Sequence, residues 1–416
     1  MNREEEMKMR TGIGSKVVAL LLPFAAGFGL SNAAWSGDDH GHRHGADIPR
    51  YVVDPYWPKP LPNRWVTGAV GGICLDRQDH VFGINRSDIT ALELRVGKVA
   101  APPVIEYDSE GNVVSAWGDA NVLPRGIHGC FVDHKNNLWI AGSSGGMVQK
   151  WSLESKQLLL QIGDRNVCDG PCGETASLNS STVTLNQPAD IAVDPVTDEV
   201  YIADGYGNHR VVVFDANGRF LRQWGSAGTG AGQFAFVGGG HPHCVVMSKE
   251  GLLYVCDRGN DRIQVFDKMG TLVEIIPIKP GTGNVPAPDG TPGRQAVGSA
   301  LDVALSADRE QRYILNVDTG NEVLWFLDRQ VGRGEIPPIL GGFGSQGHNA
   351  GNFTLLHMIA VDSRGNLYTS ETVDGRRLQK FVPRGKVSPQ KTDTYMGSPH
   401  YEPFPHFGRA HGDDDD

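Results

Sequence analysis

The chain has 416 residues, of which 39% are hydrophobic, so it is long enough to bury a large core and has no composition typical of disorder. Its formal net charge of −10 leaves no basic stripe to neutralise phosphates, which excludes nucleic acid as an expected partner. The 54 glycines and 25 prolines favour many turns over long helices.

The first residues have the order of an export signal. Lys16 precedes the apolar run Val17–Leu30, and small residues follow at Ser31 and Ala34. This pattern predicts a signal peptide over residues 1–34, and the run is short for a membrane span, which needs about 20 apolar residues. We therefore expect a secreted or periplasmic protein without stable membrane insertion. An uncleaved membrane anchor is the alternative.

Polar segments flank the rest of the chain. Residues 35–50 predict a linker rich in His and Asp, in which DDHGHRH (Asp38–His44) offers weak metal ligands but favours a solvated segment. Residues 393–416 predict a polar, acidic tail. The hydrophobic runs lie between these segments, in residues 51–392.

The six cysteines suggest disulfides in an exported chain. Cys168 and Cys172, in the loop CDGPC, are expected to form a local bridge. The other four lie in or beside hydrophobic runs, where buried free thiols are expected: Cys74, Cys130, Cys244 and Cys256. No repeated CxxC motif has zinc-ribbon spacing, so cysteine is not predicted to bind metal.

The central part of the chain repeats one unit six times. Each unit has an apolar run, a turn, a second apolar run, a link rich in Gly and Asp, and a third strand-like run. The units start 54 to 61 residues apart, and their first two runs cover Ile73–Ile84, Cys130–Ala141, Ile191–Ala203, Val245–Cys256, Val303–Asn316 and Ile359–Thr369.

Four short strands per unit at this spacing predict an all-β fold, a six-bladed β-propeller over residues 51–392. A parallel α/β fold would need long helical crossovers between the strands, and the chain shows no sustained 3.6-residue periodicity. The proline-rich segment Tyr51–Trp65 is expected to close the ring or to cap its edge. The first unit is least regular after Arg86.

One position of the repeat carries His in alternate units. Two residues before the first run, the second, fourth and sixth units have His128, His243 and His357. The other units have Gly71, Ala189 and Leu301 there. Because the innermost strand of every blade lines the channel, three imidazoles would meet around the axis. Such a set favours catalytic zinc, with copper, iron or cobalt as alternatives. The competing interpretation is that each His packs in the channel or caps a loop.

Three polar residues directly follow the second strand of their repeats: Arg86, Tyr206 and Arg258. A Tyr beside a dication and two guanidinium groups is easier to deprotonate and could act as a base, and an Arg could hold a carboxylate or an oxyanion. The alternatives are that Arg258 forms a turn-bracing salt bridge and that Tyr206 is an ordinary channel-lining aromatic.

The repeats resemble NHL repeats, and Val70–Phe381 resembles the peptidyl-α-hydroxyglycine α-amidating lyase family, whose fold is a six-bladed propeller. The motifs that carry the resemblance include LPRGIHGCFVDHKNNLWIAG, QPADIAVDPVTDEVYIADGYGNHRVVVFD and LLYVCDRGNDRIQVF. In that family three His bind catalytic zinc, a Tyr is the base and two Arg line the pocket. These roles fall on His128, His243, His357, Tyr206, Arg86 and Arg258.

The resemblance implies a lyase that cleaves the C–N bond of an N-acyl-α-hydroxyglycine into an amide and glyoxylate. Zinc would polarise the substrate, and Tyr206 would remove the hydroxyl proton. The family also has a structural calcium ion whose acidic ligand follows the third His, where this chain has Met358. The family's cysteine pairs are not reproduced, because Gly207 and Tyr254 stand at cysteine-like positions.

Two other functions remain open from the sequence. The same centre could serve a metal-dependent hydrolase or lyase that acts on another small substrate. A non-catalytic NHL scaffold that binds a protein is the rival from a different class. The expected partner is a small-molecule or peptide substrate, and the expected state is a monomer.

Overall fold

The computed structural model describes residues 48–172, 178–236, 241–284, 286, 288, 290, 297–330 and 335–387. The predicted signal peptide, the DDHGHRH segment and the acidic tail lie outside these residues. Among the described residues, no helix combines the length and the apolar character needed to cross a membrane.

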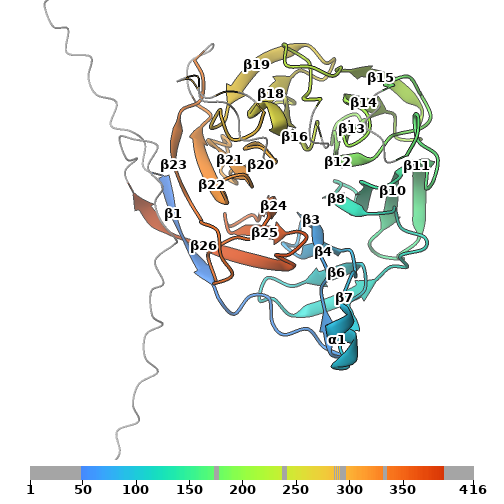
Figure 1. Ribbon diagram of the computed structural model, residues 1–416, viewed down its shortest axis with the longest axis vertical. Coiled ribbons are helices and arrows are strands. Elements are labelled where there is room, and N and C mark those ends of the chain that lie inside the picture. The colour runs from blue at the N-terminus through green and yellow to red at the C-terminus, as the bar shows by residue number, and fades with distance from the viewer. Residues whose placement is uncertain are drawn as a thin grey trace, which may run out of the picture. The chain divides into compact units, whose positions relative to one another are not determined.

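Six four-stranded antiparallel sheets stand around a central axis, which confirms the predicted six-bladed propeller (Figure 1). From the innermost strand outward, blade one contains β3 (Val70–Leu75), β4 (Val81–Asn85), β6 (Val104–Tyr107) and β7 (Val113–Trp117). Blade two contains β8 (Ile127–Val132), β9 (Asn137–Gly142), β10 (Gly146–Ser152) and β11 (Leu158–Asp164). Blade three contains β12 (Pro188–Val193), β13 (Val200–Asp204), β14 (Arg210–Phe214) and β15 (Phe220–Trp224).

Blades four and five follow the same order. They contain β16 (Val245–Met247), β17 (Leu253–Asp257), β18 (Arg262–Phe266) and β19 (Leu272–Pro277); and β20 (Asp302–Leu305), β21 (Tyr313–Asp318), β22 (Val323–Asp328) and β23 (Ile339–Phe343). Blade six contains β24 (Leu356–Val361), β25 (Leu367–Glu371) and β26 (Arg377–Val387), and its outermost strand comes from the other end of the chain.

The strand β1 (Ile48–Asp54) closes the ring. It pairs antiparallel with β26, with register partners from Ile48 and Val387 to Asp54 and Lys380. The Tyr51 ring stacks on Phe326 of blade five at 5.7 Å between centroids, so the closing strand also packs on the neighbouring blade. The expectation that the proline-rich leading segment closes the ring is therefore correct, although the pairing begins before Tyr51.

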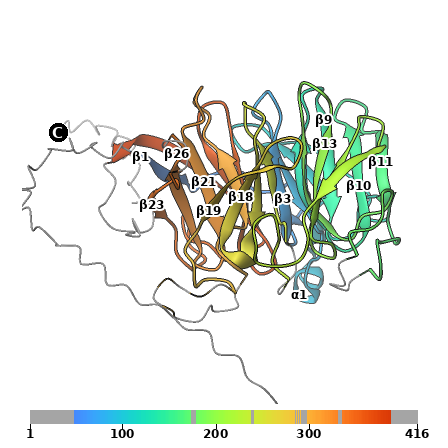
Figure 2. The same cartoon turned by 90° about the horizontal axis from the view of Figure 1, so that it is seen from above.

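The irregular part of blade one forms a short excursion between β4 and β6. It contains the helix α1 (Ala91–Arg95) and the two-residue strand β5 (Val99–Ala100), which pairs in parallel with β2 (Trp65–Val66) from the segment before β3. The helix begins with a capping box between Thr90 and Glu93, which satisfies amide groups at its first turn. Figure 2 shows α1 at one face of the ring.

The depth of each strand in its blade explains its sequence pattern. An inner strand has neighbouring blades against both faces, so β13 is buried throughout, whereas the outermost strand β15 alternates between partly buried and exposed side chains. Apolar side chains between blades two and three form one such interblade cluster, which includes Trp139, Ile191 and Phe214.

A buried ion pair braces the turn after the second strand in several blades. Arg210 Nε lies 2.9 Å from Asp204 Oδ2 in blade three, and Arg262 Nε lies 2.7 Å from Asp257 Oδ2 in blade four. The last residue of the second strand thus pairs with the first residue of the third. In blade four this pair is made by Arg262.

All six cysteines form disulfides. The local bridge between Cys168 and Cys172 is confirmed, but the expectation of free thiols at the other four positions is wrong. Cys74 pairs with Cys130 because the inner strands of blades one and two converge at the axis, with 5.8 Å between the two Cα atoms. Cys244 pairs with Cys256 because these residues lie opposite each other where β16 meets β17.

The two bridges of unequal span should differ in their contribution to stability. Cys74 and Cys130 are 56 residues apart, whereas Cys168 and Cys172 are 4 apart. Chain entropy predicts a loss of about 4 kcal/mol for the Cys74→Ala/Cys130→Ala variant and about 2 kcal/mol for Cys168→Ala/Cys172→Ala. Chemical denaturation without reductant measures both. Equal losses in the free energy of unfolding would contradict the larger contribution expected of the Cys74–Cys130 bridge, which joins blades one and two.

Candidate metal centre

Three imidazoles from alternate blades meet at the propeller axis. His128 and His357 lie on β8 and β24, and His243 lies two residues before β16. The ring centroids are 4.6 to 5.1 Å apart, and one nitrogen from each ring lies within 4.8 Å of a nitrogen of the other two. All three side chains are buried. The predicted set therefore comes together, and it could hold a metal ion.

The other ring nitrogen of these residues faces the next blade. His128 Nδ1 lies 2.8 Å from the carbonyl oxygen of Ala189, and His243 Nδ1 lies 2.8 Å from that of Leu301. Ala189 and Leu301 occupy the same repeat position as the histidines, one blade further on. A carbonyl oxygen can only accept a hydrogen bond, so each Nδ1 carries the proton and each Nε2 presents a lone pair.

His357 has the corresponding neighbour in Gly71 of blade one. The backbone of Gly71 raises the pKa of His357 slightly, although Nδ1 makes no regular hydrogen bond. The six equivalent positions thus alternate between an imidazole and a backbone group of the following blade. This alternation orients at least two rings of the cluster toward the axis.

Burial keeps the three imidazoles neutral. Burial and, to a smaller extent, the nearby guanidinium groups of Arg86 and Arg258 together lower the pKa of His357 to about 3. Burial is also the largest cause of the low pKa of His128 and His243, which lies well below the usual value. Metal ligation requires the neutral form of His, so these rings are in the protonation state needed to bind a cation near neutral pH.

Tyr206 lies in the loop after β13 and points its hydroxyl into the cluster. The hydroxyl oxygen is 3.0 Å from His128 Nε2 and 3.1 Å from His243 Nε2. Both nitrogens are acceptors, and a phenol has one proton, so the hydroxyl can satisfy only one of them. A cation on the Nε2 atoms removes this deficit. The donor set therefore fits a metal such as zinc.

The two arginines lie at the same end of the channel as Tyr206. Arg258 begins the 3₁₀ turn η1 (Arg258–Asn260), and its guanidinium carbon is 5.5 Å from the centroid of the Tyr206 ring. Arg86 Nε donates to the carbonyl oxygen of Ile127 at 3.3 Å, next to His128 in sequence. All six predicted site residues thus gather around one point.

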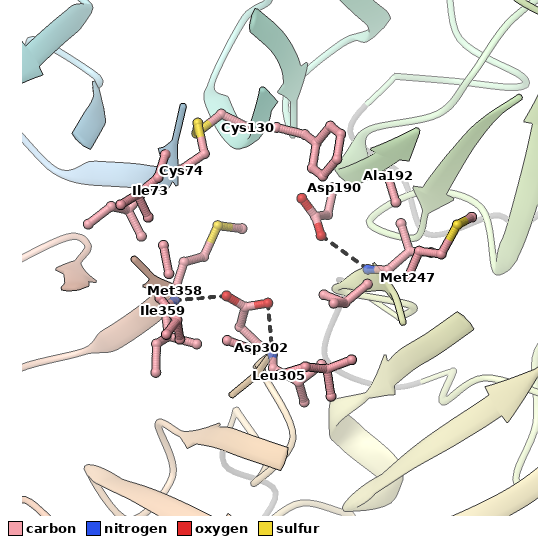
Figure 3. A pocket seen from close by; sticks show the side chains of 18 of the residues that line it. Ile73, Cys74, Cys130, Asp190, Ala192, Met247, Asp302, Leu305, Met358 and Ile359 are labelled. Carbon is pink, nitrogen blue, oxygen red and sulfur yellow. Dashed lines mark hydrogen bonds between the residues drawn. A yellow bond between two sulfur atoms is a disulfide. The ribbon is translucent and has the colours of Figure 1, made fainter. Parts of the chain in front are cut away.

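Sequence reasoning missed two buried carboxylates in the channel. Asp190 and Asp302 line a cavity of about 280 Å³ whose walls are inner-strand residues that follow the histidine positions (Figure 3). Asp190 Oδ2 accepts the Val245 amide at 3.1 Å, and Asp302 Oδ2 accepts the Ile359 amide at 2.8 Å. Burial raises the pKa of Asp302 to about 7, and burial together with the charge of Asp302 raises that of Asp190 well above its usual range.

These carboxylates occupy the repeat position directly after the histidine position, but in blades three and five. The acidic residue that the resemblance implies after His357 is absent, since Met358 lies there and lines the same cavity. The sequence signal was the repeat alignment, in which Asp190 and Asp302 stand at one equivalent position.

Comparison with known proteins relates this chain to proteins with NHL repeats, several of which are named as amidating enzymes. Residues 185–214 and 240–266 match the NHL repeat family. The chain is 31% identical over 228 residues to peptidyl-glycine α-amidating monooxygenase B of Xenopus laevis, which covers 50% of this chain and 24% of that protein. It is 23% identical over 329 residues to a probable peptidyl-α-hydroxyglycine α-amidating lyase of Caenorhabditis elegans, which covers 75% of this chain and 82% of that protein.

The chain thus spans about a quarter of the Xenopus relative's length. Among solved structures, a streptogramin B lyase is similar with a TM-score of 0.47 and 11% identity, covering 80% of this chain and 98% of that chain. That likeness is too low to carry an argument. The sequence relatives, together with the NHL repeats, confirm the resemblance stated from the motifs.

The raised pKa of Asp302 predicts a pH-dependent stability. The folded pKa is about 7 against 3.8 in the unfolded chain, so the stability present below pH 4 is lost as pH rises through 7. Asp302→Asn cannot ionise, so its stability relative to the wild type should increase by about 4 kcal/mol between pH 4 and pH 8. Urea unfolding at pH 4 and pH 8, with a chelator present, measures this change. If the free energies of unfolding of the variant and the wild type differ by the same amount at both pH values, the prediction is contradicted.

A second variant tests the cluster as a metal site. His243→Ala removes one of three ligand nitrogens and should reduce bound metal from one equivalent to below about a tenth, while the propeller stays folded. Elemental analysis of protein prepared without chelator or His-tag measures the metal, and circular dichroism measures the fold. His209→Ala is the matched control, because His209 is also buried on this side but lies outside the cluster. Stoichiometric metal in His243→Ala would refute the site.

Proposed function

We propose that this protein cleaves the C–N bond of an N-acyl-α-hydroxyglycine. It carries NHL repeats and is similar to peptidyl-α-hydroxyglycine α-amidating lyases. The products are an amide and glyoxylate. The observation that carries the proposal is the Tyr206 hydroxyl within 3.1 Å of two Nε2 atoms of a buried three-histidine cluster. We further propose zinc as the ion, because three neutral imidazoles with an open position suit it.

Tyr206 is proposed as the base of this reaction. It would accept the proton of the substrate hydroxyl, the oxygen would form the aldehyde C=O bond of glyoxylate, and the electron pair of the C–N bond would move to nitrogen. The amide nitrogen then takes up one proton, so atoms and charges balance. Tyr206 would act in its deprotonated form, whose negative charge the guanidinium of Arg258 over the ring would stabilise until the proton is accepted.

Arg86 and Arg258 also provide the charge needed to hold the substrate carboxylate. Both flank the histidine cluster closely enough to lower the pKa of His357. A guanidinium presents a planar pair of donors that matches a carboxylate, so an arginine fixes the orientation of the glycine part of the substrate. A bound dication would act as a Lewis acid that polarises a substrate oxygen.

The disulfides support an exported location. Each of the six cysteines is paired, and disulfides persist in oxidising compartments and are rare in reducing ones. We therefore propose that the protein works outside the cytoplasm, in the periplasm or after secretion, on a small-molecule or peptide substrate.

Replacement of the proposed base tests the reaction directly. Tyr206→Phe should lower kcat for glyoxylate release from N-benzoyl-α-hydroxyglycine by about 10²- to 10⁴-fold, the usual contribution of a general base, while metal content stays at the wild-type level. Glyoxylate is measured by derivatisation, and metal by elemental analysis.

Tyr254→Phe is the matched control. Tyr254 is a buried tyrosine of β17 whose hydroxyl contacts Arg329 away from the cluster, so its loss should leave kcat within about threefold. Wild-type protein with bound metal that releases no glyoxylate would rule out this substrate class. Full activity in Tyr206→Phe would instead assign the base elsewhere.

A further inference from the structure

The segment His241–His243 lies between the two loops that carry Tyr206 and Arg258. It ends in the candidate ligand His243. The backbone N–H of His241 donates to the carbonyl oxygen of Gly205 at 2.8 Å, one residue before Tyr206. The imidazole Nδ1 of His241 accepts from the backbone N–H of Gly259 at 3.2 Å, one residue after Arg258. One residue therefore contacts both loops.

Close packing on both sides makes this arrangement rigid. A Cβ atom at Gly205 would lie 1.9 Å from the carbonyl oxygen of Pro242, and one at Gly259 would lie 2.7 Å from His241 Cε1. Neither contact is possible for a real side chain, so both loops depend on glycine to approach the segment. His241 itself is 1% exposed.

The contact with Gly259 also bears on the position of Arg258. The turn η1 is held at its ends by the side chains of Asp257 and Asn260, which bond to each other at 2.8 Å. The N–H of Gly259, in the middle of the turn, is held by His241. A shift of this amide would move the adjacent Arg258, whose guanidinium lies over the Tyr206 ring.

We propose that His241 is a positioning residue that holds Arg258 in register with Tyr206 and His243 through the Gly259 amide. This role rests on the proposed lyase function, in which Arg258 holds the substrate carboxylate or supports the phenol. His241 does not itself touch the reacting atoms. It acts by fixing the distance between the proposed base and its neighbouring guanidinium.

Two substitutions separate positioning from simple packing. His241→Leu keeps the volume but removes the acceptor, whereas His241→Asn places an amide oxygen close to the former Nδ1. We expect kcat/KM for N-benzoyl-α-hydroxyglycine to fall at least tenfold in the Leu variant and to stay within threefold in the Asn variant. Metal content should remain at one equivalent in both. Equal losses in the two variants, or loss of metal from His241→Leu, would overturn the proposal.

A double-mutant comparison shows whether the effect passes through Arg258. In an Arg258→Met background, His241→Leu should have no further effect on kcat/KM, because the group that it positions is absent. If the fold-losses in kcat/KM of His241→Leu and Arg258→Met multiply in the double variant, His241 acts through a group other than Arg258. His209→Leu serves as the control for loss of a buried imidazole near Tyr206. Any fold-loss in kcat/KM that it causes should multiply with the fold-loss caused by Arg258→Met, because His209 is not expected to act through Arg258.

A structural measurement keeps this inference separate from the proposed activity. Crystal structures of the variants report the distance from the Arg258 guanidinium to the Tyr206 ring, which is 5.5 Å here. This distance should be retained in His241→Asn and increase by more than 1 Å in His241→Leu. That outcome would support the positioning role even if the wild type released no glyoxylate. An unchanged distance in His241→Leu would refute the role even if the enzyme were active.

Discussion

The central constraint on this protein is the convergence of six innermost strands on one axis. Any repeat position on these strands is presented six times at one depth, so residues far apart in sequence become neighbours. The hydrogen bonds of His128 and His243 to carbonyl oxygens of the next blade depend on this geometry. They fix the tautomer of both rings. The chemistry at the axis therefore follows from the way in which neighbouring blades meet.

Those parts of the fold and site that repeat could be predicted from the sequence. The strand runs recur at a regular spacing, and alignment of the repeats placed His128, His243 and His357 at one level. The partners of the cysteines could not be predicted in this way. Cys74 and Cys130 stand at neighbouring rather than identical repeat positions, and their pairing depends on the distance between two inner strands. Asp190 and Asp302 were overlooked because each begins an apolar run.

The two alternatives for Arg258 show what the structure adds to a repeat pattern. The sequence DRGNDR contains two arginines, and either could brace the turn. The structure assigns the brace to Arg262, whose equivalent in blade three is Arg210. Arg258 directly follows the second strand of its blade, as Arg86 does in blade one, and its guanidinium lies over the Tyr206 ring. The repeat thus provides the scaffold, and the residues that depart from the repeat gather near the axis.

Closure of the ring by β1 and β26 has a consequence for synthesis of the chain. β1 is made early, but its partner in blade six is among the last strands to leave the ribosome. Domains complete their folding only when their parts are available, and unpaired strand edges promote aggregation. Blades one to five each come from one continuous stretch of chain, whereas β1 can pair only after β26 has been made. The edge of β1 therefore stays open to pairing with other chains until β26 joins it.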